Sequence, residues 1–450
     1  MFFKKIESEG LAHYSYMVGE GKEVAVIDPR RDVGVYIKEA RKEGLKINYI
    51  LETHRNEDYI VGSRELAERT GATIYISGHE DLGHVYGEKI FDGDKIKVGS
   101  LTIQGVHTPG HTLGHMSYGV YEEGREKAYM VFTGDCLFMG DLGRTDFYGE
   151  ENLEKMTGLL YDSVFEKLMP LGDEVLVFPA HGAGSACGES MEERPYSTLG
   201  YEKVYNPELQ VNSKEEFIKA FGRMRIKPRY FEIMEQYNVK GAEFIGEEVK
   251  LEPLLLEEVQ NQGITVIDSR TKEAYFGGHI PETLFFSLKN FSTYVGTIMD
   301  MDTPVAFLVE GNEVEKLQSL YRYARRIGLE NLKGYIVDGN SQWEETEKDL
   351  EKLQTITAKE YLDLDHKEFV LLDIRTPEAL SSEDPYKNRI NIPLQHLYKD
   401  YEKLPKDQPI YILCGSGDRS ATAASFLKNK GYDGRVISGG LLTLKPLLNE

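Results

Sequence analysis

The segment ETHRNEDYIVGS, residues 52–63, follows an apolar run and places His54 just beyond the end of a predicted strand. Three further segments follow it along the chain: HTPGHTLGHMS (107–117), FTGDCLF (132–138) and FPAHG (178–182). Side chains that can bind a metal therefore recur at strand ends, notably His54, Asp135 and His181. In layered α/β folds, the loops at strand ends build the functional site.

Around these segments, short β-rich runs alternate with helical runs. Strands are predicted over 23–29, 47–54, 73–77, 127–135 and 174–182, with paired strands over 95–106 and helices over 62–71 and 151–168. Strands that alternate with helical segments are typical of a layered α/β domain.

The order and spacing of the four segments resemble the metallo-β-lactamase fold, which implies an N-terminal αββα sandwich over residues 1–248. The superfamily motif is T-H-x-H-x-D-H, whereas this chain has Asn56 and Tyr59 at the second and last histidine positions. Two-zinc hydrolases such as glyoxalase II use both of those histidines. A zinc pair with the usual geometry would therefore lack one ligand in each site.

Persulfide dioxygenases of the same fold use fewer ligands. The resemblance implies one Fe(II) per N-terminal domain, held by His54, His111 and Asp135. Two histidines and one carboxylate form the facial set of non-haem iron oxygenases. Supporting hydrogen bonds, rather than ligation, are expected from Asp58, His181 and Tyr59.

The segment GDLGRTDF (140–147) resembles the GxGRTDF segment of the mitochondrial sulfur dioxygenase family. The resemblance implies that Arg144 binds a carboxylate or phosphate of the persulfide carrier through a charge-assisted hydrogen bond. Asp146 is expected to orient it.

The second half of the chain contains an internal repeat. The segment TVIDSR (265–270) matches VLLDIR (370–375), and PVAFLVEGNEVEK (304–316) matches PIYILCGSGDRSA (409–421). Each copy continues into a helix and a strand that ends in glycine. The repeat predicts two rhodanese-like α/β domains of similar size, over 249–348 and 352–450.

The segment from Cys414 to Arg419 resembles the active-site loop of rhodanese sulfurtransferases, in which a cysteine opens a loop that an arginine closes. Its C-x4-R length suits a sulfur atom rather than phosphate. The loop amides and the following helix N-terminus then stabilise a thiolate or persulfide at Cys414, and Arg419 adds positive charge. Substrate contacts are expected from Gly415, Ser416, Gly417, Asp418 and Ser420. A basic residue is common where Gly415 stands, and Asp418 adds negative charge, so both bear on substrate preference.

The first repeat lacks this chemistry, because Val309 aligns with Cys414 and Val314 aligns with Arg419. We therefore expect residues 249–348 to be a degenerate rhodanese-like domain with a structural or docking role.

The two other cysteines have different surroundings. Cys136 follows Asp135 on a predicted strand, so its side chain is expected to point into the core. Cys187 lies in a Gly-rich loop just past His181 and is a candidate reactive thiol, with a buried small residue as the equal alternative.

Composition argues against several function classes. The net charge is −22 and no long basic tract occurs, which argues against nucleic-acid binding. No stretch approaches the roughly 20 apolar residues that span a bilayer, and the first residues contain no apolar run that is typical of a signal peptide. Three cysteines in 450 residues are not a disulfide framework. We expect a cytoplasmic enzyme that binds neither nucleic acid nor membrane; assembly into a homo-oligomer stays open.

These resemblances imply a dioxygenase that uses O2 to oxidise a low-molecular-weight thiol persulfide to sulfite and thiol. The C-terminal rhodanese domain would pass persulfide sulfur to sulfite, which gives thiosulfate. Two alternatives stay open: a zinc thioesterase of the glyoxalase II kind, and a metal-free scaffold that serves the sulfurtransferase. The sequence leaves the thiol carrier open among glutathione, coenzyme A, bacillithiol and cysteine.

Overall fold

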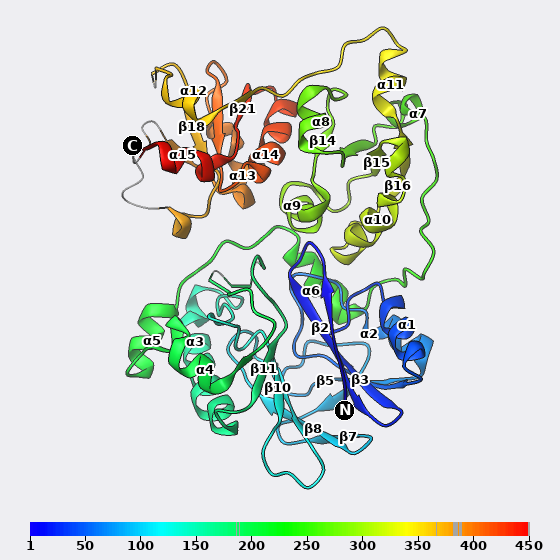
Figure 1. Cartoon of the computed structure of the whole chain (residues 1–450), viewed down its shortest axis with the longest axis vertical. Coiled ribbons are helices and arrows are strands. Elements are labelled where there is room, and N and C mark those ends of the chain that lie inside the picture. The colour runs from blue at the N-terminus through cyan, green and yellow to red at the C-terminus, as the bar shows by residue number, and fades with distance from the viewer. Residues whose placement is uncertain (186, 189, 366, 381–385, 387–388, 449–450) are drawn as a thin grey trace. The chain divides into compact units, whose positions relative to one another are not determined.

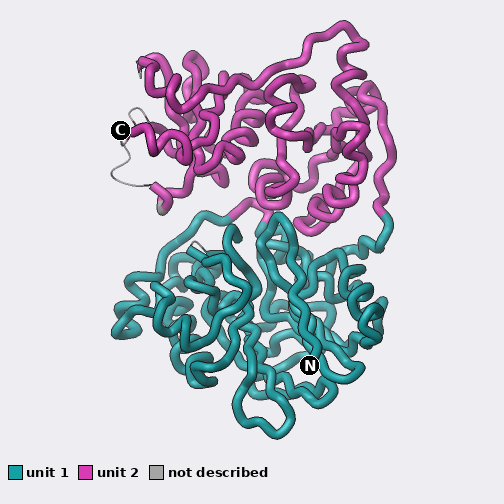
Figure 2. Tube along the Cα trace, in the orientation of Figure 1, with its two compact units in different colours: residues 1–227, 231–248 teal, residues 228–230, 249–450 magenta. Residues whose placement is uncertain are grey.

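The strands and helices of the protein lie in two compact units in its computed structural model (Figures 1 and 2). Unit 1 comprises residues 1–227 and 231–248, and unit 2 comprises residues 228–230 and 249–450. The structure describes residues 1–185, 187–188, 190–365, 367–380, 386 and 389–448. Within those residues, no helix combines the length and apolar character needed to cross a membrane.

Unit 1 contains two six-stranded sheets. The first has the order β1 (Phe2–Ser8), β2 (His13–Glu20), β3 (Glu23–Ile27), β4 (Lys46–Leu51), β5 (Thr73–Ser77), β6 (Glu88–Ile90). The second has the order β12 (Ser197–Thr198), β11 (Leu176–Pro179), β10 (Met130–Gly134), β9 (Met116–Tyr121), β8 (Leu101–His107), β7 (Lys95–Val98). The helices of this unit are α1 (Gly34–Lys42), α2 (Ser63–Thr70), α3 (Leu153–Asp162), α4 (Leu199–Tyr205), α5 (Lys214–Phe221) and α6 (Phe231–Lys240).

The buried apolar side chains of unit 1 form three layers of core. The central layer joins residues of the two sheets, such as Tyr16 and Leu51 of the first with Phe132 of the second. A second layer packs the outer face of the first sheet against α1 and α2, and a third packs β10 and β11 against α3 and α5. Helices therefore cover the outer faces of two stacked sheets, and the predicted αββα sandwich is confirmed.

The strands predicted from the sequence occur close to their expected places, and β5 coincides with residues 73–77. The helix predicted over 151–168 is irregular: a 3-10 turn precedes α3, and a π-type turn over Ser163–Leu168 follows it. The predicted strand over 127–135 is the fully buried β10. Gly134 ends β10 with φ 51°, where a Cβ atom would lie 2.5 Å from His115 Nε2. This position therefore needs glycine, and the tight turn leads directly into Asp135.

Unit 2 contains two parallel sheets. The first has the order β14 (Leu284–Phe285), β13 (Thr265–Asp268), β15 (Val305–Val309), β16 (Leu332–Val337). The second has the order β17 (Thr355–Ile356), β21 (Gly434–Ile437), β20 (Ile410–Leu413), β18 (Val370–Asp373), β19 (Arg389–Asn391). The helices are α7 (Leu256–Asn261), α8 (Lys272–Gly277), α9 (Phe291–Ile298), α10 (Lys316–Arg326), α11 (Gly339–Glu344), α12 (Ala358–Leu362), α13 (Leu394–Asp400), α14 (Asp418–Asn429) and α15 (Gly440–Leu448).

The two halves of unit 2 share a buried ion pair at the same place in the repeat. Arg270 binds Asp268 at the end of β13, and Arg375 binds Asp373 at the end of β18, each with an Nη2–Oδ2 distance near 2.7 Å. Strands β14, β13, β15 and β16 also follow the same order as β19, β18, β20 and β21. The rhodanese-like character of 249–348 stays a prediction, which this shared topology supports.

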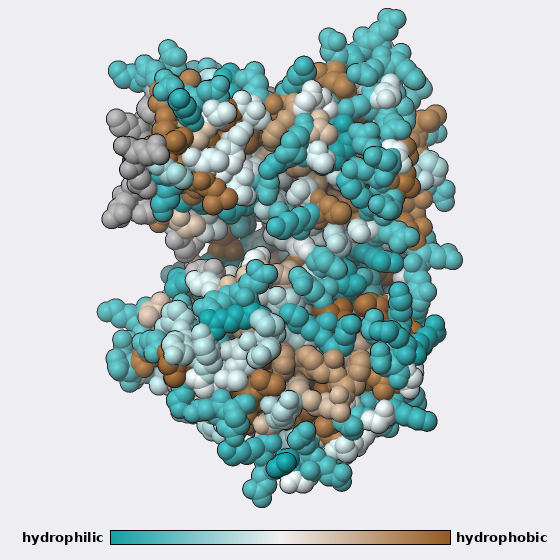
Figure 3. Space-filling model, in the orientation of Figure 1, coloured by the Kyte–Doolittle hydropathy of each residue, from teal (hydrophilic) through white to brown (hydrophobic). Residues whose placement is uncertain are grey.

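The face of the molecule in Figure 3 is mainly hydrophilic, with smaller apolar patches. Such a surface agrees with the net charge of −22.

Candidate metal centre and sulfur-transfer loop

Three strand-end loops of unit 1 bring His54, His111 and Asp135 together. Asp135 Oδ2 lies 3.4 Å from His111 Nε2 and 3.9 Å from His54 Nε2. The two imidazole rings meet edge to face with their centroids 4.9 Å apart. All three side chains are buried. The sequence-predicted ligand set thus converges on one small volume.

The orientation of His54 is set by a hydrogen-bond chain behind it. Thr53 Oγ1 donates to Asp28 Oδ2 at 2.7 Å, and lies 2.8 Å from His54 Nδ1. Because the hydroxyl proton is used on Asp28, the hydroxyl oxygen accepts the Nδ1 proton of His54. The Nε2 lone pair of His54 is then left to face the site. Burial also holds the pKa of His54 well below its usual value, which keeps the ring neutral.

His111 is oriented in a similar way by the main chain. Its Nδ1 lies 2.8 Å from the carbonyl oxygen of Arg144, which can only accept a hydrogen bond. In the neutral ring, the Nδ1 atom therefore carries the proton and the Nε2 lone pair faces the site. Burial acts to lower the pKa of His111, but Glu57 and Asp135 outweigh it and raise the pKa, so a metal ion at Nε2 would compete with a proton.

Asp135 is held from its other side by His181. Asp135 Oδ1 accepts a hydrogen bond from His181 Nδ1 at 2.7 Å, and His181 Nε2 lies 2.7 Å from Asp58 Oδ2. The second contact has the distance of an ion pair, although its direction does not suit a hydrogen bond. Burial acts to lower the pKa of His181, but the two carboxylates outweigh it and hold the pKa well above its usual value. Each ring nitrogen of His181 is thus in contact with a carboxylate.

The residues present fit a metal ion. His54 Nε2, His111 Nε2 and Asp135 Oδ2 are all buried, and none has a hydrogen-bond partner in the described part of the chain. Buried polar atoms are almost always partnered, so three such atoms that converge need an explanation. Two imidazole nitrogens and one carboxylate oxygen are ligands suited to divalent iron or zinc.

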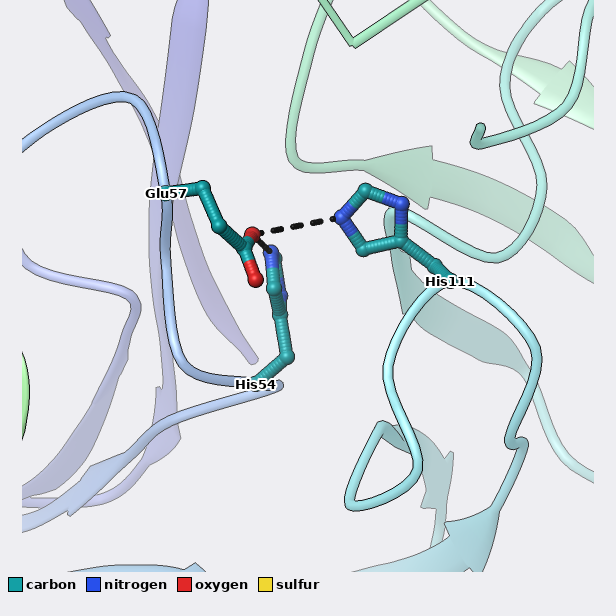
Figure 4. Close-up of side chains that lie close together, drawn as sticks. All are labelled: His54, Glu57 and His111. Carbon is teal, nitrogen blue, oxygen red and sulfur yellow. Dashed lines mark ion pairs between the residues drawn. The ribbon is translucent and has the colours of Figure 1, made fainter. Parts of the chain in front are cut away.

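Glu57 also belongs to this cluster, although it stands at an unspecified position (x) of the superfamily motif T-H-x-H-x-D-H. Its Oε2 lies 3.5 Å from His111 Nε2 and 3.6 Å from His54 Nε2, and Figure 4 shows the carboxylate facing both rings. The side chain is fully buried and Oε2 has no hydrogen-bond partner among the residues described. The one feature of the sequence that could have indicated this role is its position three residues after His54, in the same motif.

In unit 2, the loop after β20 surrounds the Cys414 sulfur. The amide of Gly417 donates to Cys414 Sγ at 3.1 Å, and the side chain of Cys414 is buried. Gly440 supports the loop from behind with φ 55°, where a Cβ atom would lie 2.3 Å from the Cys414 carbonyl oxygen. Helix α14 begins at Asp418, so its first turn faces the loop. The amide of Gly417, at the N-cap of α14, therefore points at the sulfur, which suits a thiolate or persulfide.

A cavity of about 760 Å³ opens beside this loop. Gly415, Ser416 and Arg419 line it on the loop side, and Leu441, Leu442, Lys445 and Pro446 of α15 line the rest. The other predicted contact residues, Gly417, Asp418 and Ser420, do not line the cavity, and Ser420 is fully buried. The cavity combines cationic and apolar walls.

Both the N-terminal and the C-terminal domain match known protein families. Residues 9–181 match the model of the metallo-β-lactamase superfamily, and residues 357–444 match the model of the rhodanese-like domain. The human mitochondrial persulfide dioxygenase ETHE1 is 31% identical over 235 residues, which covers 50% of this chain and 83% of that protein. The chain belongs to the persulfide dioxygenase family.

Two further proteins are similar to this chain over different lengths. The hydroxyacylglutathione hydrolase GloC of Haemophilus influenzae is 28% identical over 214 residues, which covers 43% of this chain and 89% of that protein. A crystal structure of a metallo-β-lactamase from Staphylococcus aureus is 31% identical with a TM-score of 0.67, and covers 75% of this chain and 98% of that one. The chain thus joins a persulfide dioxygenase-like domain to a C-terminal rhodanese domain.

The two residues that depart from the superfamily motif both donate a side-chain hydrogen bond to a backbone carbonyl in this persulfide dioxygenase homologue. Asn56 turns its amide toward the carbonyl of His54, at 3.3 Å. Tyr59 donates to the carbonyl of Asp28 at 3.3 Å and packs against His13, with ring centroids 4.0 Å apart. Both side chains therefore support the conformation of the loop after β4.

All the hydrogen bonds that the Arg144 side chain donates in the described residues go to other residues of unit 1. Its guanidinium makes a two-pronged ion pair with Asp146, with both N–O distances 2.7 Å, and donates to the carbonyls of Arg225 and Ile226. The side chain is only 1% exposed. These contacts favour a role in holding the loop whose carbonyl orients His111, and the substrate-binding role of Arg144 and Asp146 stays a prediction.

Cys187 lies beside the metal centre, and Cys136 does not. The Cys187 sulfur lies within 4.8 Å of ligand atoms of His111 and Asp135. Burial raises the pKa of its thiol well above the usual value, and nearby carboxylates raise it further. This favours the protonated thiol over a nucleophilic thiolate. Cys136 packs in the core between β10, α3 and α5.

Proposed function

We propose that the N-terminal domain is an Fe(II)-dependent persulfide dioxygenase and that the C-terminal domain forms thiosulfate from its product. The oxidation is RSSH + O2 + H2O → RSH + SO3²⁻ + 2H⁺, where R is a low-molecular-weight thiol carrier. The observation that carries this proposal is that three buried atoms without hydrogen-bond partners, one each from His54, His111 and Asp135, lie close together. One bound Fe(II) would supply the redox centre at which the persulfide sulfur and O2 react.

The surrounding residues prepare this chemistry before the substrates arrive. Thr53 and the Arg144 carbonyl hold the two imidazoles in the tautomer that presents Nε2. His181 fixes the orientation of Asp135. Because the ligands are buried, bulk water has little access to the reacting sulfur.

The rhodanese domain would complete the conversion through Cys414. The thiolate attacks the outer sulfur of RSSH, the S–S bond of the donor breaks, and RS⁻ leaves. Sulfite then attacks the outer sulfur of the Cys414 persulfide, which releases the thiolate, thiosulfate and one proton. The two steps sum to RSSH + SO3²⁻ → RSH + S2O3²⁻, with no external oxidant. The Gly417 amide is placed to stabilise the sulfur anion in each step.

A zinc thioesterase is the second candidate, and the similarity to GloC is the observation that favours it. Asn56 and Tyr59 argue against a zinc pair, because they replace two histidines that the two-zinc motif uses as ligands. Asp58, His181 and Cys187 do place ligand atoms within 4.8 Å of one another, so the number of metal ions per chain is part of the test. A metal-free scaffold is disfavoured by the unpartnered ligand atoms.

The metal content of the full chain, purified without oxygen, separates these candidates. We expect one iron per chain, persulfide-dependent O2 uptake, and thiosulfate as the final product. Cys414→Ser should keep the O2 uptake but accumulate sulfite. Zinc with thioesterase activity, or protein that binds no metal, would contradict the proposal for the N-terminal domain. Thiosulfate formation by Cys414→Ser would contradict the proposal for the C-terminal domain.

A further inference from the structure

Residues 249–348, which lack a counterpart of Cys414, form one half of unit 2. This half packs directly on α14, the helix that follows the Cys414 loop. Tyr275 and Phe285 bury their rings with Ala421 of α14. The amide of Phe285 donates to Ser425 Oγ at 3.1 Å, and Asn429 Nδ2 donates to the carbonyl of Glu282 at 2.8 Å. Strand β14 and helix α14 therefore lie side by side, as Figure 1 also shows.

This packing brings Lys272 to the active loop. Lys272 is the first residue of α8, and its Nζ lies 2.9 Å from Oδ1 of Asp418. Asp418 is the first residue of α14 and immediately precedes Arg419. Its other oxygen, Oδ2, lies 3.4 Å from Ser416 Oγ, which belongs to the cavity wall.

The charges of the two halves influence each other. The hydrogen bond with Asp418 is the main reason why the pKa of Lys272 is raised, and the negative charge of Cys414 adds to it. Tyr294 of α9 is a second example: burial raises its pKa to about 12, with Cys414 and Asp418 adding and Arg419 opposing. Two residues of the half without a nucleophile thus lie within electrostatic range of Cys414.

Asp418 would otherwise be a disadvantage at this position. The proposed acceptor, sulfite, is an anion, and so is the Cys414 thiolate that attacks the donor. A carboxylate at the start of α14 repels both of them and offsets part of the positive potential of the helix N-terminus. The net charge of −22 gives no compensating attraction from the rest of the chain.

We propose that Lys272 is a positioning residue for sulfur transfer, which neutralises Asp418 and thereby lets an anionic acceptor such as sulfite reach the Cys414 persulfide. This inference rests on the proposed thiosulfate-forming function. It gives residues 249–348 a role that needs no nucleophile. Lys272 supplies a positive charge beside the Cys414 loop, which has Gly415 where a basic residue is common.

An ordinary ion pair between the two halves is the alternative. Lys272 and Asp418 are 35% and 37% exposed, so water screens their ion pair and it contributes little to stability. A purely structural role therefore predicts little change in any rate. A role in substrate charge recognition instead predicts a change in KM that depends on the charge of the acceptor.

The test uses the full chain and four variants: Lys272→Met, Lys272→Arg, Asp418→Asn, and the double variant Lys272→Met/Asp418→Asn. Thiosulfate formation is measured against sulfite concentration with a fixed persulfide donor. Lys272→Met should raise the KM for sulfite about five- to tenfold and change kcat much less, because one uncompensated charge remains near the acceptor. Lys272→Arg and the double variant should restore the KM. High salt should reduce the effect.

A matched pair of thiol acceptors isolates the charge. For Lys272→Met, kcat/KM should fall for 3-mercaptopropionate but stay near wild type for 2-mercaptoethanol, because the two thiols differ in one remote carboxylate. Equal loss with both thiols, or an unchanged KM for sulfite, would overturn the role of Lys272. If the wild-type chain neither carries sulfur on Cys414 by mass spectrometry nor makes thiosulfate, the proposed function itself fails, and the inference fails with it.

Discussion

Thr53→Val removes one buried hydroxyl and keeps the shape of the side chain. The hydroxyl lies 2.7 Å from Asp28 Oδ2 and 2.8 Å from His54 Nδ1, so its loss leaves one acceptor and one donor without this partner. Each buried group that loses its partner costs about 1–3 kcal/mol, so the metal-free protein should lose about 2–6 kcal/mol of stability. Loss of such a supporting contact behind a ligand typically weakens metal binding about 10- to 100-fold.

Two measurements check this prediction. Urea unfolding of the metal-free chain gives the change in stability, and anaerobic competition with an iron chelator gives the change in affinity. Thr53→Ser keeps the hydroxyl and serves as the matched control, with near wild-type affinity expected. Iron bound by Thr53→Val as tightly as by the wild type would show that the chain Asp28–Thr53–His54 does not orient the ligand.

Three further predictions concern the same site. Replacing His54, His111 or Asp135 by alanine should abolish iron binding and O2 uptake, whereas Asn56→Ala should keep iron, as metal analysis would show; the reverse pattern would refute the ligand assignment. Glu57→Gln removes a buried negative charge that faces both imidazoles, so iron affinity in an anaerobic titration should fall about tenfold or more; unchanged affinity would mean that Glu57 does not contribute to binding. Arg144→Lys keeps the charge but loses the two-pronged pair with Asp146, so the melting temperature should fall while the KM for persulfide stays near wild type; a raised KM with unchanged stability would instead support substrate binding.

The architecture was predictable because its signals are local. Runs of alternating or continuous apolar residues set β4, β5 and β10, and the motif residues follow at their ends. His54 follows β4 of the first sheet and Asp135 follows β10 of the second. Their convergence therefore could not be predicted from strand order within one sheet, and was expected only from the resemblance to a known fold that stacks the two sheets.

Glu57 and Asp28 were not predicted, for a different reason. Whether Glu57 faces the metal centre depends on the conformation of the loop after β4, which no periodicity specifies. Asp28 acts through the hydroxyl of Thr53, which comes from a neighbouring strand end. Burial raises the pKa of Asp28 to about 7, a consequence of packing that the sequence around it does not reveal.

Contacts between distant segments account for the other differences. The carbonyls that engage Arg144 belong to Arg225 and Ile226, far along the chain in a segment without a recognisable motif. The partner of Asp418 is Lys272, from the other copy of the repeat. A repeat shows that two domains share a topology, but not which surfaces pack together.

The two sites differ in the sign of their local charge, and this difference suits the proposed order of reactions. The metal centre gathers the carboxylates of Glu57, Asp58 and Asp135 around its ligands, and the raised pKa of His181 and a bound Fe(II) would offset part of this negative charge. The loop of Cys414 instead offers the Gly417 amide, Arg419 and Lys445 of the cavity wall, with Asp418 paired to Lys272. The anionic product proposed for the first site is therefore the kind of acceptor that the second site attracts, which supports the proposed formation of thiosulfate at Cys414.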